Sequence, residues 1–161
     1  PTIGALSPDA VKKAIVTPLT ERQTSITPKA LEEIVQETCG YPFFIQEWAF
    51  NAWNCAPTNC LTLEDVKQAH PKTIRNLEES LFRVRIDCLT KREIEFVRAM
   101  ASLGDGPYAV EAVIEALKTT SSRISPVRST LIKKGMIYSP QHGQLAFTVP
   151  LFARYVNRNK V

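Results

Sequence analysis

The fold of the second half of the chain is decided by the stretch SSRISPVRSTLIKKGMIYSPQHGQLAFT, residues 121–148. Its first part has apolar residues at helical spacing and stops at Gly135, a residue at which helices commonly end. Two short apolar runs follow, 136–139 and 145–148, and the Pro-Gln-His-Gly segment 140–143 between them has the composition of a turn. The stretch therefore predicts a helix followed directly by a β-hairpin.

Two more helices are expected just before this stretch and one after it. Thr90 and Glu93 have the spacing of a capping box at the start of the first helix. The Gly-Asp-Gly-Pro segment 104–107 separates that helix from a second one, 109–117. Helix, helix, helix, strand, turn, strand, helix is the order of a winged helix, so residues 87–161 are predicted to form a winged-helix domain with a β-hairpin wing.

The first half of the chain, residues 1–86, has only helical patterns. Pro18 is expected to end the first helix and Gly40 the second, because proline lacks the N–H of a helix interior and glycine suits a left-handed C-cap. Its expected helices begin at a capping residue or a proline: Ser7, Thr27, Pro42, Thr62 and Pro71. The fold class predicted for the whole chain is mostly α, a small helical bundle of residues 1–86 followed by the winged helix.

Composition limits the class of protein. With 161 residues, of which 44% are hydrophobic and 22% charged, the chain is typical of a globular protein. It has no run near 18 apolar residues and no signal segment, so we expect no membrane span and a cytoplasmic location. Because the first residue is Pro1 rather than Met, we expect a C-terminal fragment of a longer protein.

The residue types of known catalytic and metal sites are not arranged in any familiar pattern. The sequence has no phosphate-binding loop, no dinucleotide-binding glycine motif, no zinc-protease motif and no nucleophile elbow. Cys55 and Cys60 lie near no histidine and no second cysteine pair, which is a poor match to a zinc site, and His70 and His142 are far apart. We therefore expect no catalytic residues, no metal site and no enzyme activity in this chain.

Positive charge is concentrated in the second half. Residues 87–161 contain 11 Lys and Arg against 6 Asp and Glu, a net charge of +5, whereas residues 1–86 have a net charge of −1. In a DNA-binding winged helix, the third helix enters the major groove and basic side chains contact phosphates. The candidate nucleic-acid-binding residues are therefore Arg123, Arg128, Lys133 and Lys134 of that helix and His142 at the tip of the wing. The alternatives are that these charges only solvate an exposed face, or that the domain contacts a protein.

One segment resembles a known family. Gly40-Tyr-Pro-Phe-Phe-Ile-Gln46 is similar to the G-x-P motif in the helical lid of STAND and related AAA+ ATPases, some of which are described only as ATP-binding proteins. The preceding Leu6-Ser-Pro-Asp-Ala10 resembles the entry into that lid, and the stretches 89–93, 131–138 and 143–152 resemble the winged helix that follows it. The resemblance extends over nearly the whole chain.

The resemblance implies an ATPase whose N-terminal P-loop core lies outside this sequence and binds ATP or ADP with Mg. The lid would fold over the nucleotide, and Gly40, Tyr41 and Pro42 would lie near its adenine or ribose. A helix N-terminus at Pro42 offers backbone N–H groups, and a glycine permits close approach. The chain departs from many AAA+ lids, which sense the γ-phosphate with an arginine, because residues 36–53 contain no Arg or Lys.

Three functions follow from these observations. The first is a regulatory fragment of an AAA+/STAND-like ATPase, in which a nucleotide-sensing lid is joined to a winged helix that contacts double-stranded DNA or a protein partner. The second is a winged-helix DNA-binding transcriptional regulator. The third is a non-catalytic protein-interaction module, favoured by the apolar residues of the wing, Ile137, Leu145 and Phe147.

Overall fold

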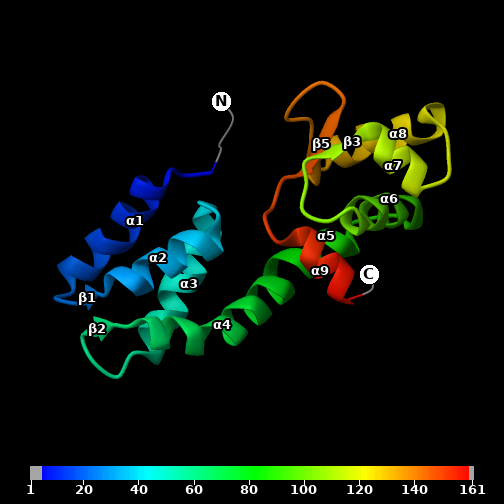
Figure 1. Cartoon of the computed structure of the whole chain (residues 1–161). Helices are drawn as coiled ribbons and strands as arrows, with labels where there is room; N and C mark the ends of the chain where they lie inside the picture. The colour runs from blue at the N-terminus through cyan, green and yellow to red at the C-terminus, as the bar shows by residue number, and fades with distance from the viewer. Residues whose placement is uncertain (1–4, 160–161) are drawn as a thin grey trace. The chain divides into compact units, whose positions relative to one another are not determined.

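The computed structural model describes residues 5–159 and shows two compact units that meet between Ser80 and Leu81 (Figure 1). Sequence analysis places the boundary between residues 86 and 87. The division lies within a π-helical segment, η1 (Glu78–Phe82), which follows α4 and precedes α5 without a break in helical structure. Each unit encloses its own core and is described by itself below.

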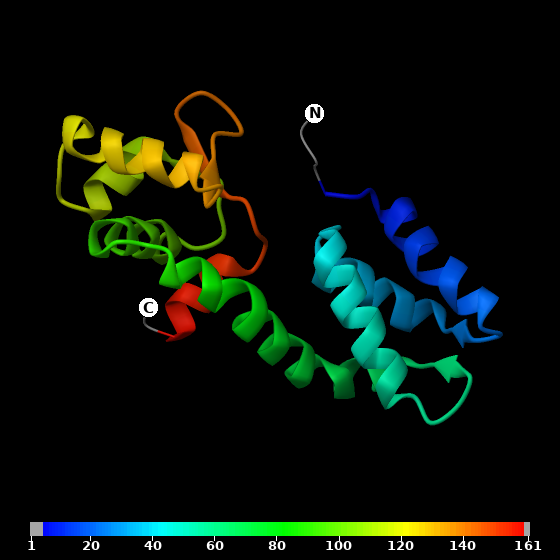
Figure 2. The same cartoon turned by 180° about the vertical axis from the view of Figure 1, so that it is seen from behind.

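The first unit is a bundle of four helices with one small pair of strands. Its helices α1, α2 and α3 pack against one another, and α4 packs on α2 and α3 (Figure 2). Strands β1 and β2 pair in parallel, Ser25 with Cys60 and Ile26 with Leu61. The elements are α1 (Pro8–Glu21), β1 (Ser25–Ile26), α2 (Pro28–Thr38), α3 (Pro42–Cys55), β2 (Cys60–Leu61) and α4 (Leu63–Leu77).

The starts of these helices lie where sequence analysis expects them. Ser7 accepts a hydrogen bond from the N–H of Ala10, and Thr27 accepts one from the N–H of Ala30. Thr62 and Asp65 form a reciprocal capping box at the start of α4. The core they enclose is apolar and aromatic, and its largest fully buried side chains are Trp48, Phe44, Ile34, Leu61 and Leu77.

Two prolines predicted to mark helix boundaries lie inside helices. Pro18 lies inside α1, which continues to Glu21, and Pro71 lies inside α4 rather than starting a new helix. Proline removes one backbone donor and crowds the preceding turn, but a helix can continue when its other contacts outweigh that cost. In α1, Leu19 is buried one residue after the proline, and in α4 the helix continues through the fully buried Thr73.

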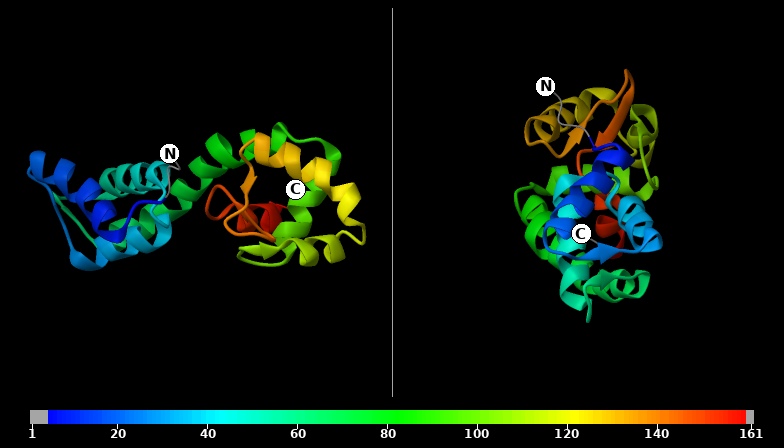
Figure 3. Two further views of the ribbon diagram at one scale, coloured as in Figure 1. Left: turned by 90° about the horizontal axis from the view of Figure 1, so that it is seen from above. Right: turned by 90° about the vertical axis from the view of Figure 1, so that its left-hand side faces the viewer.

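The second unit has the predicted order of helices and hairpin, with an additional two-residue strand between the first and second predicted helices. Its three-stranded sheet has the order β3-β5-β4 with both pairs antiparallel, and α9 packs on α6 (Figure 3). The elements are α5 (Arg83–Asp87), α6 (Lys91–Ser102), β3 (Tyr108–Ala109), α7 (Val110–Ala116), α8 (Ser121–Lys133), β4 (Ile137–Tyr138), β5 (Gln144–Phe147) and α9 (Phe152–Asn159). The predicted fold class, a mostly α chain with a helical bundle and a β-hairpin wing, is confirmed.

An aromatic cluster forms one part of the largely aliphatic core of the second unit. Phe152 lies 5.8 Å from Phe82 and 5.3 Å from Phe147, between ring centroids, and Tyr155 lies 5.1 Å from Phe82. The edge-to-face and tilted ring pairs in this cluster are the favourable geometries for aromatic side chains. The cluster therefore joins α9, β5 and the end of η1, which fixes the base of the wing. Among the described residues, no helix has the length and apolar character that crossing a bilayer requires.

Candidate nucleic-acid interface

Helix α8, the predicted recognition helix, has one buried face and one exposed face. Ile124 and Leu131 are buried against the unit's core. The exposed face is built mainly of hydroxyl-bearing side chains, with one lysine near the end of the helix. Hydroxyl groups can contact phosphates or base edges without adding charge. The exposed residues of this face are Ser122, Ser125, Pro126, Ser129, Thr130 and Lys133.

Arg123 lies beside this face, at the rim of a hollow between α6 and the start of α8. The hollow has a volume of about 700 Å³, and the buried residues Phe96 and Ile124 are among those that line it. Arg92, from α6, also lines it. Within the described residues, neither arginine forms an ion pair. Two arginines from different helices therefore line one hollow, and their guanidinium groups can donate hydrogen bonds to an anion.

Hydroxyl groups and one carboxylate complete the polar lining of the hollow. Ser122 and Thr119 contribute hydroxyls, and Glu95 of α6 contributes the carboxylate. Glu95 offsets one of the two arginine charges, so the lining has a formal charge of +1. A phosphate diester has one negative charge and accepts hydrogen bonds from guanidinium and hydroxyl groups. The hollow has the chemistry of a contact to a nucleic-acid backbone.

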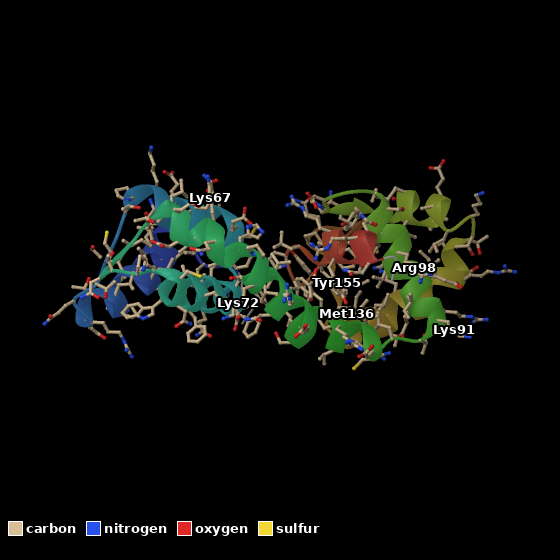
Figure 4. All side chains as sticks on the ribbon, turned by 90° about the horizontal axis from the view of Figure 1, so that it is seen from below. Lys67, Lys72, Lys91, Arg98, Met136 and Tyr155 are labelled. Atoms are coloured by element: carbon tan, nitrogen blue, oxygen red, sulfur yellow. The ribbon has the colours of Figure 1, made fainter. Side chains whose placement is uncertain are left out.

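Helix α6 extends this basic character. Lys91 and Arg98 are both exposed on α6, and both are labelled in Figure 4. Sequence analysis does not include α6 among the candidate nucleic-acid contacts, so Arg92 is an additional candidate that only the structure suggests. The local pattern around Arg92 is that of an ordinary amphipathic helix, and only the packing of α6 beside α8 shows that Arg92 and Arg123 share a hollow.

Lys134 has a different environment from the other candidate residues. Its Nζ lies 2.8 Å from Oε2 of Glu93 and donates a hydrogen bond of 2.9 Å to the carbonyl of Cys88. The Glu93 side chain is only 5% exposed. Burial by itself raises the pKa of Glu93, but the hydrogen bonds from Lys134 and Thr90 lower that pKa more, so it lies below its ordinary value. The structure therefore places Lys134 in an internal contact that ties the end of α8 to the start of α6.

The remaining candidates lie apart from that ion pair. Arg128 is half-buried on α8, and Lys133 is exposed. His142 is exposed in the turn of the wing. The hydroxyl of Ser139 closes this turn by donating to the carbonyls of Gln141 and Gln144, at 2.9 and 2.7 Å.

The base of the wing is joined to the end of α8 by a separate set of contacts. Arg85 donates hydrogen bonds of 3.1 Å to the carbonyl of Gly135 and 3.4 Å to the hydroxyl of Thr148. The same Thr148 hydroxyl donates to the carbonyl of Gly135 at 2.6 Å. The wing is thus positioned by α5 and by the end of α8, which fixes where its tip can reach.

The segment that resembles a nucleotide-contacting motif lies in the first unit. Gly40 and Cys39 are both left-handed, with φ of +71° and +49°. Tyr41 is the N-cap of α3 and makes no side-chain capping hydrogen bond, and Pro42 is the first residue of that helix. The space beside the Gly40 Cα is filled by the backbone of Leu6, whose N–H donates a 2.8 Å hydrogen bond to the Gly40 carbonyl.

Two features of this segment bear on its predicted contact with a nucleotide. The backbone of Leu6 fills the space into which a side chain at position 40 would project, and the stretch 36–53, which has no lysine or arginine, offers no cation for a phosphate. The thiols are likewise dispersed, with Cys39 and Cys88 exposed and Cys55 and Cys60 half-buried. In the described part of the chain, no group of three or more His, Cys, Asp or Glu side chains could bind a metal ion.

Comparisons with known proteins match one family model and a number of solved structures. A family model described as a domain of unknown function, DUF8462, matches residues 79–156. No curated protein matches the chain. The chain is similar to solved structures of the RuvB Holliday junction branch migration motor of Thermotoga maritima, with 12% identity and a TM-score of 0.44, over 98% of this chain and 50% of that one. Two single-site mutants of the same RuvB give the same values. The chain thus spans about half the length of these structures.

Proposed function

We propose that the second unit is a winged-helix module that binds the phosphate backbone of double-stranded DNA. The observation that supports this most directly is the pair Arg92 and Arg123, which line one hollow from α6 and α8 without an ion-pair partner among the described residues. The hydroxyl-rich face of α8 and the net charge of +5 over residues 87–161 are consistent with backbone contact. Binding of this kind depends strongly on salt and weakly on base sequence.

We further propose that the chain is the regulatory region of an AAA+ or STAND-type ATPase, with the first unit as its lid. The support for this is the Gly40-Tyr41-Pro42 motif between α2 and α3 and the winged helix that follows the bundle. Nucleotide state in a P-loop core would then reorient the lid and control access to the winged helix. We expect the chain alone to have no ATPase activity and to bind ATP weakly or not at all, because the motif lacks a cation and Gly40 is packed on Leu6.

The test is a fluorescence-anisotropy titration of a labelled DNA duplex with the full 161-residue chain, at about 50 mM and about 150 mM salt. Binding should weaken as salt rises. Arg92→Gln and Arg123→Gln should each weaken it about fivefold and reduce the slope of log affinity against log salt by about one. Glu95→Gln should strengthen binding, because it removes the carboxylate that opposes a phosphate in the hollow.

Control variants distinguish binding at this site from a nonspecific effect of the chain's positive charge. Lys13→Ala removes one exposed positive charge from α1 in the first unit and should leave affinity unchanged. The double variant Arg123→Ala with Arg128→Ala should abolish binding if α8 enters the groove. No binding by the unmodified chain at low salt, or equal losses for Lys13→Ala and Arg123→Gln, would contradict the proposal.

A protein-contact function is the second candidate, and one observation favours it. Ile132 near the end of α8 and Tyr138 on β4 are 39% and 46% exposed, which places two large apolar side chains outside the core of the winged helix. A pull-down of a partner that survives nuclease treatment and is lost in Tyr138→Ser would favour this function over DNA binding.

A further inference from the structure

The first unit has an apolar groove that its own core does not fill. The groove lies between α1 and α3 and has a volume of about 360 Å³. Phe50 forms one wall and is 63% exposed, a large fraction for an aromatic side chain. Exposed apolar surface with a polar rim commonly marks an interaction site on a soluble protein. The residues that shape the groove are Ala14 and Pro18 from α1, Ala49, Phe50 and Trp53 from α3, and Arg22 at its end.

Small side chains leave this space open. Ala14, Pro18 and Ala49 lie where longer side chains would close the gap between the two helices. The span along α1 from Ala14 to Arg22 is about 12 Å at the rise of an α-helix. A groove of that length accommodates about two turns of a partner helix, with anchors at positions i, i+4 and i+7.

The positive charge of Arg22 indicates that a molecule bound in the groove has an acidic group. Among the residues that the structure describes, Arg22 is the only charged one in the lining, and its guanidinium carbon lies 5.7 Å from the centre of the Trp53 ring. A guanidinium packed on a ring face keeps its edge N–H groups available to a carboxylate. Within the described residues, Arg22 forms no ion pair.

Helix α3 adds no competing charge. Its only ionisable carboxylate, Glu47, is not in the lining, and its Oε2 accepts hydrogen bonds from Asn51 and Asn76. The groove therefore combines an uncharged apolar floor with one positive end. We propose that it docks an amphipathic helical segment of a partner protein, whose apolar stripe lies between α1 and α3 and whose acidic side chain pairs with Arg22.

The test uses three synthetic helical peptides of about 14 residues with leucines at i, i+4 and i+7. The first has a glutamate one turn beyond each end of the stripe, so that either chain direction brings a carboxylate to Arg22. The second and third have glutamine or lysine at those positions. Binding to the full chain is followed by the indole N–H resonance of Trp53, and Trp48, which is fully buried, is the internal reference.

The glutamate peptide should bind about fivefold more tightly than the glutamine peptide, and the lysine peptide most weakly, as a solvent-exposed ion pair predicts. Arg22→Gln should remove this preference without weakening the glutamine peptide. Phe50→Ala should weaken all three about tenfold through lost apolar contact. Phe43→Ala is the matched control, because Phe43 is 36% exposed on the same helix but does not line the groove, and it should change nothing.

The three substituted side chains are all exposed, so each variant should keep the circular dichroism of the unmodified chain. The proposal is overturned if no peptide shifts the Trp53 resonance, if the three peptides bind equally, or if Phe43→Ala weakens binding as much as Phe50→Ala. It is independent of DNA binding, so failure here leaves the anisotropy experiment unaffected.

Discussion

At the scale of single residues, position 40 in the first unit accepts no residue other than glycine without strain. It ends the turn between α2 and α3 in a left-handed conformation, with φ of +71°, and an added Cβ would collide with the carbonyl oxygen of Leu6. The backbone hydrogen bond from Leu6 to Gly40 fixes the segment before α1 at this point. A side chain here meets both a strained backbone and an occupied space.

Gly40→Ala should lower the free energy of unfolding by about 2 kcal/mol, the combined effect of a left-handed alanine and a steric collision. Gly135 is the matched control, because its φ is +66° but nothing lies within 4 Å of an added Cβ. Gly135→Ala should cost only about 1 kcal/mol, from backbone conformation alone. Urea denaturation followed by circular dichroism measures both. Equal losses in the two variants would show that Leu6 does not pack on Gly40.

Residue patterns predict the conformation of Gly40 but not its neighbour. A glycine after an amphipathic run and before proline indicates a helix stop, and the structure has left-handed residues there. The contact with Leu6 joins residues far apart in sequence, and no local pattern encodes it. The same limit applies to Lys134, which the sequence groups with Lys133 but which the structure places against Glu93.

At the scale of elements, the Glu93–Lys134 ion pair joins the start of α6 to the end of α8. Because the pKa of Glu93 is lowered in the folded chain, the stability from its ionised form is fully present above about pH 4.5, its ordinary value, and is lost as pH falls through the lower folded pKa. The melting temperature of the second unit should therefore decrease as the pH is lowered from about 4.5.

Glu93→Gln should flatten this fall in melting temperature, because glutamine does not titrate. Lys134→Met should destabilise the unit at neutral pH by about 1–2 kcal/mol, because it leaves a buried carboxylate with fewer partners. Thermal melts between about pH 3 and pH 7 measure both effects. An unchanged pH profile in Glu93→Gln would assign the acid sensitivity to other carboxylates.

Helices with several turns of periodic apolar residues or with a capping residue are predicted well from the sequence, whereas strands of two residues are not. The capping box of Thr90 and Glu93 is confirmed, as are the hairpin and α8. The strands β1, β2 and β3 have two residues each, too few for an alternating pattern. The sequence therefore indicates loops at β1 and β2, and at β3 it starts a helix from Ala109. Pro18 and Pro71 show the converse error, because tertiary packing continues a helix that the local rule ends.

At the scale of the whole molecule, the candidate sites depend on which helices become neighbours. Sequence analysis predicts Arg123 on an exposed recognition helix, and the structure agrees on its exposure. It does not predict that Arg92 and Glu95 line the same hollow, nor that α1 and α3 enclose a groove ending at Arg22. Periodicity assigns a residue to a face of its own helix, whereas a hollow needs the packing of two helices.

Each of the two units encloses its own core, so a destabilising substitution in one unit should leave the stability of the other unit unchanged. The core of the first unit centres on Trp48 and Phe44, and that of the second on Phe152 and its aromatic neighbours. Gly40→Ala should therefore increase amide hydrogen exchange in α3 and α4 but not in α6 and α9, and Lys134→Met should do the reverse. Hydrogen-exchange mass spectrometry of the full chain resolves these helices separately. If either variant raised amide exchange equally in both sets of helices, the two cores would unfold as one cooperative unit. Substitutions in the groove between α1 and α3 could then also change the proposed DNA binding by α6 and α8.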